Sequence, residues 1–63
     1  MEYRLKYNEN GYHIQVKKYI FNIIPIWITI KTFEEDWVYY KNDKEYLDYG
    51  LLNAYELLDK LQE

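Results

Sequence analysis

Few side chains in this 63-residue chain could carry covalent chemistry. It contains no serine and no cysteine, and His13 is its only histidine. A nucleophile paired with a base is therefore available only through Thr29 or Thr32. Neighbouring carboxylates that could act as acid and base, or bind a hard cation, occur at Glu34, Glu35 and Asp36. A charged run in a turn is usually solvated, so we expect no enzyme, no catalytic residue and no metal or other cofactor.

The aromatic content is the most informative feature of the composition. The chain has nine Tyr, two Trp and two Phe. A globular chain of about 60 residues buries only roughly 60% of the surface that its unfolded form exposes. Disulfides are impossible without cysteine, and His13 alone cannot hold structural zinc. Because Tyr and Trp supply large contact areas at low entropic cost, we expect several rings to face outward and form a binding surface.

The strongest candidates for that surface follow the middle of the chain. Tyr and Trp dominate interface energies when a partner buries them. The competing structural interpretation is that some of these rings cover the seam between helix and sheet, and we expect both. The best hot-spot series runs from Trp37 through the tyrosines to Tyr55, and the predicted protein-binding residues are Trp37, Tyr39, Tyr40, Tyr46 and Tyr49, together with Glu34, Glu35 and Asp36.

Charge is divided unevenly along the sequence. The part through Phe33 has a net charge of +3, the part from Glu34 onward has −6, and the whole chain has −3. The acidic part could steer association with a cationic protein or imitate nucleic acid toward a basic groove. We expect a larger protein as the partner, and this asymmetry is a hint that its surface is basic.

Alternating apolar and polar residues predict an antiparallel sheet. Asn10-Gly11 is a strong hairpin signal, because both residues tolerate the positive φ of a type I′ turn. Ile26, Ile28 and Ile30 are expected on one face of the third strand, with a charged turn after it. The expected strands are residues 2–8, 11–19, 25–33 and 37–41.

The C-terminal segment has helical spacing. Leu51, Ala54, Leu58 and Leu61 share one face, which predicts a helix over residues 51–62 with Gly50 as its N-cap. A longer helix capped by Asp43 is the alternative. The whole chain, residues 1–63, is thus expected to be one α+β domain, a mostly antiparallel four-stranded β-meander covered on one face by a single C-terminal helix.

A second candidate surface is the polar face of the first three strands. Basic residues interleaved with an aromatic ring on a sheet can bind single-stranded nucleic acid by stacking and phosphate contact. An ordinary solvated sheet face is the competing interpretation, since the chain is acidic overall. The residues of this alternative are Arg4, Lys6, Lys17, Trp27 and Lys31. A homodimer whose exposed rings meet each other is the third alternative.

The location predicted from the sequence is the cytosol. Glu2, Arg4 and Lys6 interrupt any apolar run after Met1, which argues against a signal peptide. The longest apolar stretch, Tyr19 to Ile30, is shorter than the ~20 residues of a membrane helix. We therefore expect no membrane partner.

The order of several residues resembles small uncharacterised proteins of low-GC bacteriophages and mobile elements. The resemblance is carried by the run Asn10-Gly11-Tyr12-His13-Ile14-Gln15, by Lys17, by Trp27 within an isoleucine strand, and by a terminal helix centred on Ala54. It implies a context in which small proteins bind and block a host protein, such as defence or transcription machinery, in the host cytosol. It implies no site residue.

Overall fold

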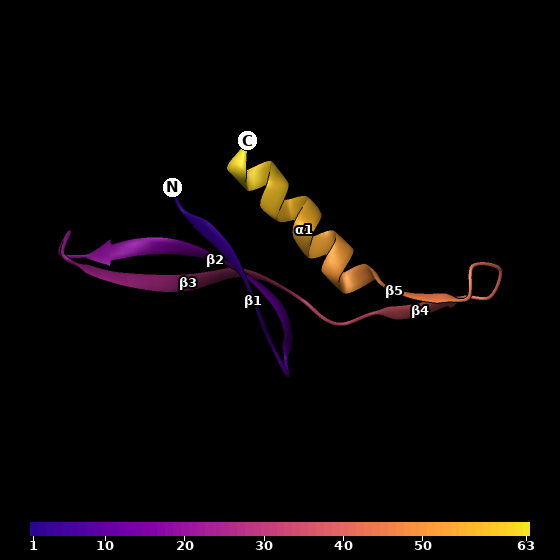
Figure 1. The fold of residues 1–63 in the computed structure, drawn as a ribbon. Coiled ribbons are helices and arrows are strands. Elements are labelled where there is room, and N and C mark those ends of the chain that lie inside the picture. The colour runs from indigo at the N-terminus through magenta and orange to yellow at the C-terminus, as the bar shows by residue number, and fades with distance from the viewer.

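The computed structural model describes the whole chain, residues 1–63, and has an α+β fold (Figure 1). Three strands form an antiparallel sheet in the order β1-β2-β3, and two further strands form a separate hairpin. One helix follows the last strand. The elements are β1 (Tyr3–Asn8), β2 (Gly11–Ile20), β3 (Ile24–Phe33), β4 (Trp37–Tyr40), β5 (Glu45–Asp48) and α1 (Tyr49–Gln62).

The predicted four-stranded meander is wrong in its last strand. β4 pairs with β5, from Trp37 opposite Asp48 to Tyr40 opposite Glu45, and not with β3. The linker Glu34–Asp36 is not a tight turn, and it carries β4 away from the first sheet (Figure 1). The β4–β5 turn includes Lys44 at φ 52°, a left-handed conformation that the residue type did not signal.

The β1–β2 hairpin is confirmed, although its turn differs from the predicted type I′. No positive φ occurs at Glu9 or Asn10, and Gly11 alone takes it, at 117°. The side chain of Asn8 accepts a hydrogen bond from the Asn10 backbone at 2.8 Å. Gly11 is also required for space, because a Cβ there would lie 2.4 Å from the backbone oxygen of Phe33.

A β-bulge interrupts the pairing of β2 with β3. Ile14 lies opposite Lys31 and Gln15 lies opposite Thr29, which leaves Ile30 as the extra residue. Because side chains alternate with a period of two, the extra residue moves Lys31 to the face that carries Ile14. Its ammonium lies 5.7 Å from the centre of the Phe33 ring on that face. The prediction that Lys31 joins the polar face is therefore wrong.

The helix begins at Tyr49, capped by Asp48, so both predicted caps, Gly50 and the alternative Asp43, are wrong. Its apolar stripe is confirmed. Ala54 is fully buried against Tyr12 and Ile14, and Ile14 is the only large side chain with no exposed surface. The partly buried residues around this core are Leu5, Phe33, Leu51, Leu57, Leu58 and Leu61. α1 lacks the length and apolar character needed to cross a bilayer.

Candidate functional site

One buried carboxylate holds the two halves of the chain together. The Oδ1 atom of Asp48 accepts hydrogen bonds from the backbone N–H groups of Gly50 at 3.0 Å and Leu51 at 3.4 Å, which caps α1. The same oxygen accepts from Asp36 N at 2.8 Å, and Oδ2 accepts from the Tyr12 hydroxyl at 2.5 Å. Helix, linker and sheet thus meet at one side chain.

The ionisation of Asp48 follows from these partners. Burial alone raises the pKa of its carboxyl, but the hydrogen bonds from Asp36, Tyr12, Leu51 and Gly50 favour the charged form. The net result is a pKa below the ordinary value for aspartate. The bond that Tyr12 donates to this carboxylate, with burial and the negative charge, raises the pKa of the Tyr12 phenol well above its ordinary value. At neutral pH the Asp48 carboxyl is therefore ionised and the Tyr12 phenol is protonated.

The sequence analysis did not identify Asp48 as the helix cap or as a residue that joins the two sheets. The stretch Tyr46 to Tyr49 fits either a strand or a helix start by its pattern. An aspartate immediately before a helical apolar stripe is, however, a recognised N-cap signal, and it could have identified this residue.

Three predicted aromatic residues share one face of the β4–β5 hairpin. Trp37, Tyr39 and Tyr46 are 57%, 49% and 66% exposed, and the strand register sets Tyr39 directly opposite Tyr46. The rings of this tyrosine pair lie 4.7 Å apart, centroid to centroid. Side chains that alternate with a period of two place Trp37 on the same face. The hairpin therefore presents three large rings to solvent.

Glu35 connects this face to the first sheet. Its Oε2 atom accepts a hydrogen bond from the indole N–H of Trp37 at 3.0 Å, and its Oε1 atom accepts from the Tyr7 hydroxyl. That bond is the main cause of a raised pKa at the Tyr7 phenol, to which burial and the charges of Glu35 and Asp48 add. Tyr7 is itself exposed and its ring lies 4.9 Å from that of Tyr12. We call Tyr7, Trp37, Tyr39 and Tyr46 the aromatic surface.

The other two predicted rings lie elsewhere. Tyr40 and Tyr49 are half-buried, with ring centroids 6.4 Å apart. Tyr40 alternates with Tyr39 along β4, and therefore points to the opposite face of the hairpin. The structure thus divides the predicted set into an exposed group and a half-buried pair, and it adds the exposed Tyr7 of β1, which was not among the predicted binding residues.

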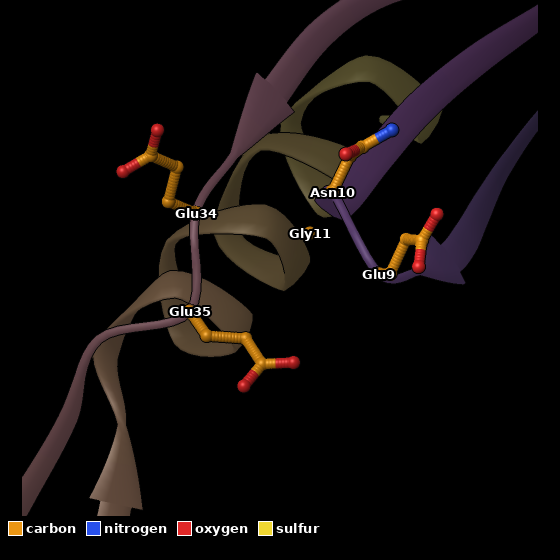
Figure 2. Close-up of a pocket in the computed structure, with 5 residues that line it drawn as sticks. All are labelled: Glu9, Asn10, Gly11, Glu34 and Glu35. Atoms are coloured by element: carbon orange, nitrogen blue, oxygen red, sulfur yellow. The ribbon is translucent and has the colours of Figure 1, made fainter.

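Two of the three predicted carboxylates line an open polar pocket of about 390 Å³ between the linker and the β1–β2 turn. Glu34 and Glu35 contribute from the linker, and Glu9, Asn10 and Gly11 contribute from the turn. Figure 2 shows the three glutamate side chains pointing in different directions. They do not converge on one point, and no group of three or more ligating side chains is placed to hold a metal ion. Asp36 acts through its backbone, which bonds Asp48 and Tyr49.

The alternative surface on the first sheet is largely satisfied within the chain. The Arg4 Nε–H donates to Gln15 Oε1 at 2.7 Å, and Gln15 Nε2 donates to Thr29 Oγ1 at 3.0 Å. The Arg4 guanidinium lies 4.1 Å from the centre of the Trp27 ring, so the ring face that would stack on a base is covered. Trp27 is half-buried.

The three lysines predicted for this surface have different surroundings. The Lys17 ammonium lies 3.7 Å from a Glu2 carboxylate oxygen. Lys6 is exposed and lies opposite His13 on the neighbouring strand. The His13 ring is itself engaged: its Nδ1 atom lies 2.9 Å from Thr32 Oγ1, and its Nε2 atom lies 2.8 Å from Asn8 Oδ1. With Lys31 on the opposite face, the surface has fewer free cations than the sequence predicted.

Comparisons with protein-family models, with curated proteins and with solved structures gave no significant match to this chain.

Proposed function

We propose that this chain is a non-enzymatic protein-binding module that docks through the aromatic surface. The observation that carries the proposal is the gathering of four exposed rings, Tyr7, Trp37, Tyr39 and Tyr46, on neighbouring elements. Exposed single rings are ordinary on a protein surface, whereas a group of Tyr and Trp is typical of binding hot spots.

Preorganisation supports the same proposal. Glu35 accepts hydrogen bonds from both Tyr7 and Trp37, and therefore restricts two of the four rings before any partner arrives. The Asp48 bonds fix the hairpin that carries the other two. A surface that is already ordered loses less conformational entropy on binding, which increases affinity for a given contact area.

The chemistry of the partner follows from the rim of this surface. Glu34, Glu35 and Asp36 adjoin the rings, and the chain from Glu34 onward has a net charge of −6. A matching partner offers apolar pockets for the rings and basic side chains around them. The phage resemblance supplies a context in which that partner is a larger host protein occluded by this chain, and this remains a prediction.

The test is quantitative capture from a lysate of the native host. Replacing Trp37 and Tyr46 by Ala removes two rings that contribute little to the core, so the circular dichroism spectrum should be unchanged. Loss of a hot spot typically weakens binding by about 2 kcal/mol or more, which is roughly 30-fold. Tyr55→Ala is the matched control, because Tyr55 is an exposed tyrosine on α1 outside the aromatic surface. Equal capture by the double variant and by Tyr55→Ala would remove the proposal.

Titration with a labelled single-stranded oligonucleotide distinguishes the nucleic-acid alternative. Binding through the polar sheet face would weaken steeply with salt and with Lys17→Glu. A flat titration at low salt would leave the protein-binding proposal as the better explanation.

A further inference from the structure

The molecule exposes more surface than a compact chain of its mass. Its accessible surface is 5157 Å² at a mass of 7.9 kDa, whereas folded monomers of that mass expose about 4,400 Å². Its radius of gyration is 14.6 Å, against about 11 Å for a compact domain of this length. The excess of roughly 750 Å² is close to the ~800 Å² that each partner buries in a standard stable interface.

At one end of the molecule β2 and β3 extend beyond the rest of the fold (Figure 1). β1 pairs with β2 only as far as Val16, so residues 17–27 form a two-stranded arm (Figure 1). We call this segment the β2–β3 arm. Figure 1 shows α1 over the other part of the sheet, and the arm without a helix above it. At its tip Phe21 and Ile23 are 85% and 77% exposed.

One face of the arm continues the apolar face of the core. The register sets Ile20 opposite Ile24, and Val16 opposite Ile28. Because paired residues share a face, these isoleucines lie on the same side as buried Val16 and Ile14. Ile20, Ile24 and Ile28 are nevertheless exposed. We call Ile20, Ile24, Ile26 and Ile28 the isoleucine face.

The tip of the arm is held in an unusual backbone conformation. Phe21 and Asn22 have φ values of 54° and 60°, and the turn is closed by a hydrogen bond from Ile23 N to Ile20 O at 3.0 Å. A left-handed conformation is disfavoured for phenylalanine, yet it directs a large exposed ring outward. Positive φ at both central residues is the geometry of a type I′ hairpin turn, in which a phenylalanine is uncommon.

We propose that the isoleucine face binds the isoleucine face of a second copy of this chain, in a two-fold symmetric, face-to-face dimer. Stacked sheets pack about 10 Å apart, which is also about the diameter of a helix. The arm of the second copy therefore occupies the layer beside α1 that the first chain leaves empty over its own arm. An isologous contact of this type closes on itself and leaves no repeating surface.

Charge also favours a second copy over other occupants. Lys18 lies opposite Ile26 and so projects from the isoleucine face, and it makes no ion pair within the chain. No acidic residue occurs between Asn10 and Phe33, whereas the part from Glu34 onward is strongly acidic. In a two-fold pair the arm of each copy lies over the arm of the other and beside its helix α1, whose acidic residues Glu56 and Asp59 complement the basic arm.

Pairing through the free edge of β3 is a less favourable geometry. Pro25 lacks a backbone donor within that edge, and the bulge at Ile30 disrupts its ladder. Both features are typical devices that protect edge strands from adding another strand. Face-to-face stacking uses side chains and needs no edge.

The test is sedimentation of the full chain at micromolar concentrations. The wild type should sediment as a dimer of about 16 kDa, twice the 7.9 kDa of one chain. Ile24→Lys introduces a charge into the isoleucine face and should weaken association by at least about 100-fold, since a buried unpaired charge is costly. Tyr19→Lys is the matched control. Tyr19 is about as exposed as Ile24, its cross-strand partner is the residue next to Ile24, and its side chain points to the opposite face of the arm. A monomeric wild type, or equal dissociation by both variants, overturns the inference.

A second measurement keeps the inference testable if Ile24→Lys does not fold. The chain contains no cysteine, so a single cysteine reports only on contact between copies. Ile26→Cys lies centrally in the isoleucine face, and mild oxidation should yield a covalent dimer far faster than Tyr19→Cys does. Equal yields from the two variants, or binding of the wild type to anionic lipid vesicles as a monomer, overturn the proposal. Trp37→Ala with Tyr46→Ala should leave the dimer intact, which separates this interface from the aromatic surface.

Discussion

Gly50→Ala is the most informative substitution in the helix, because two physical arguments predict opposite signs for it. Alanine is favoured over glycine in a helix interior by about 1 kcal/mol, so propensity alone predicts a gain in stability. The packing predicts a loss. A Cβ atom on Gly50 would lie 1.9 Å from the backbone oxygen of Glu34 and 2.9 Å from its carbonyl carbon.

The size of the destabilisation depends on how far the linker must move to make room for the Cβ atom. Glu34 meets Gly50 through its backbone, so the linker has to shift by more than about 1 Å to reach ordinary contact distance. That shift strains the bonds that Asp36 makes with Asp48 at 2.8 Å and with Tyr49 at 2.9 Å. Each such bond contributes about 0.5–1.5 kcal/mol, and overpacking costs about 1–3 kcal/mol. After the gain in propensity, we expect the free energy of unfolding to fall by about 2 kcal/mol or more.

Thermal unfolding followed by circular dichroism measures this effect. A loss of about 2 kcal/mol in a domain of this size corresponds to a fall in Tm of roughly 8–16 °C. All variants should be compared at one protein concentration, because association makes Tm depend on concentration. Asn53→Ala is the control, since Asn53 is exposed in α1 and its replacement should raise stability by about 0.5 kcal/mol through propensity. A rise in Tm for both variants would refute the packing argument.

Three further predictions concern stability. Because the pKa of Asp48 is lower in the folded than in the unfolded chain, its stabilising effect is complete above about pH 4 and is lost as the pH falls through the folded-state pKa. Urea unfolding should therefore show Asp48→Asn to be less stable than the wild type at neutral pH, with a difference that shrinks in acid; a constant difference would contradict this. Lys44→Gly relieves a left-handed backbone conformation and should raise the free energy of unfolding by about 1 kcal/mol, whereas a lower Tm would argue against strain there. Ile14→Ala opens a cavity at the only large side chain with no exposed surface and should cost about 2–5 kcal/mol; a cost below 1 kcal/mol, measured by urea unfolding, would show that the core packs loosely around Ile14.

The sequence predicted local structure better than it predicted pairing. The alternation around Leu5, Ile14 and Ile28 identified the first three strands, and the spacing of Leu51, Ala54 and Leu58 identified the helical face. Both patterns are determined within a few neighbouring residues. The partner of β4 was wrong because strand pairing depends on contacts distant in sequence, and the short segment Glu45–Asp48 has no distinctive alternation.

Side-chain placement failed at specific points for physical reasons. One bulged residue, Ile30, moved Lys31 across the sheet, and no residue type in β3 signals a bulge. The helix start was misplaced because glycine was given the role of cap, whereas Gly50 is there to allow the close approach of the linker. The candidate aromatic residues were correctly expected to include exposed rings, but the division between Tyr39 and Tyr40 depends on the strand register, which composition does not determine.

The shared carboxylate of Asp48 has a consequence for folding. No backbone ladder joins β3 to β4, so the small hairpin is joined to the larger sheet by Glu35, between Trp37 and Tyr7, and above all by the Asp48 side chain. Without it, the hairpin could open while the larger sheet stays closed, and its amide protons would exchange by local rather than global opening. With it, the first turn of the helix, the linker and the Tyr12 hydroxyl form and break together. Asp48 thereby allows two small sheets to melt as one cooperative unit.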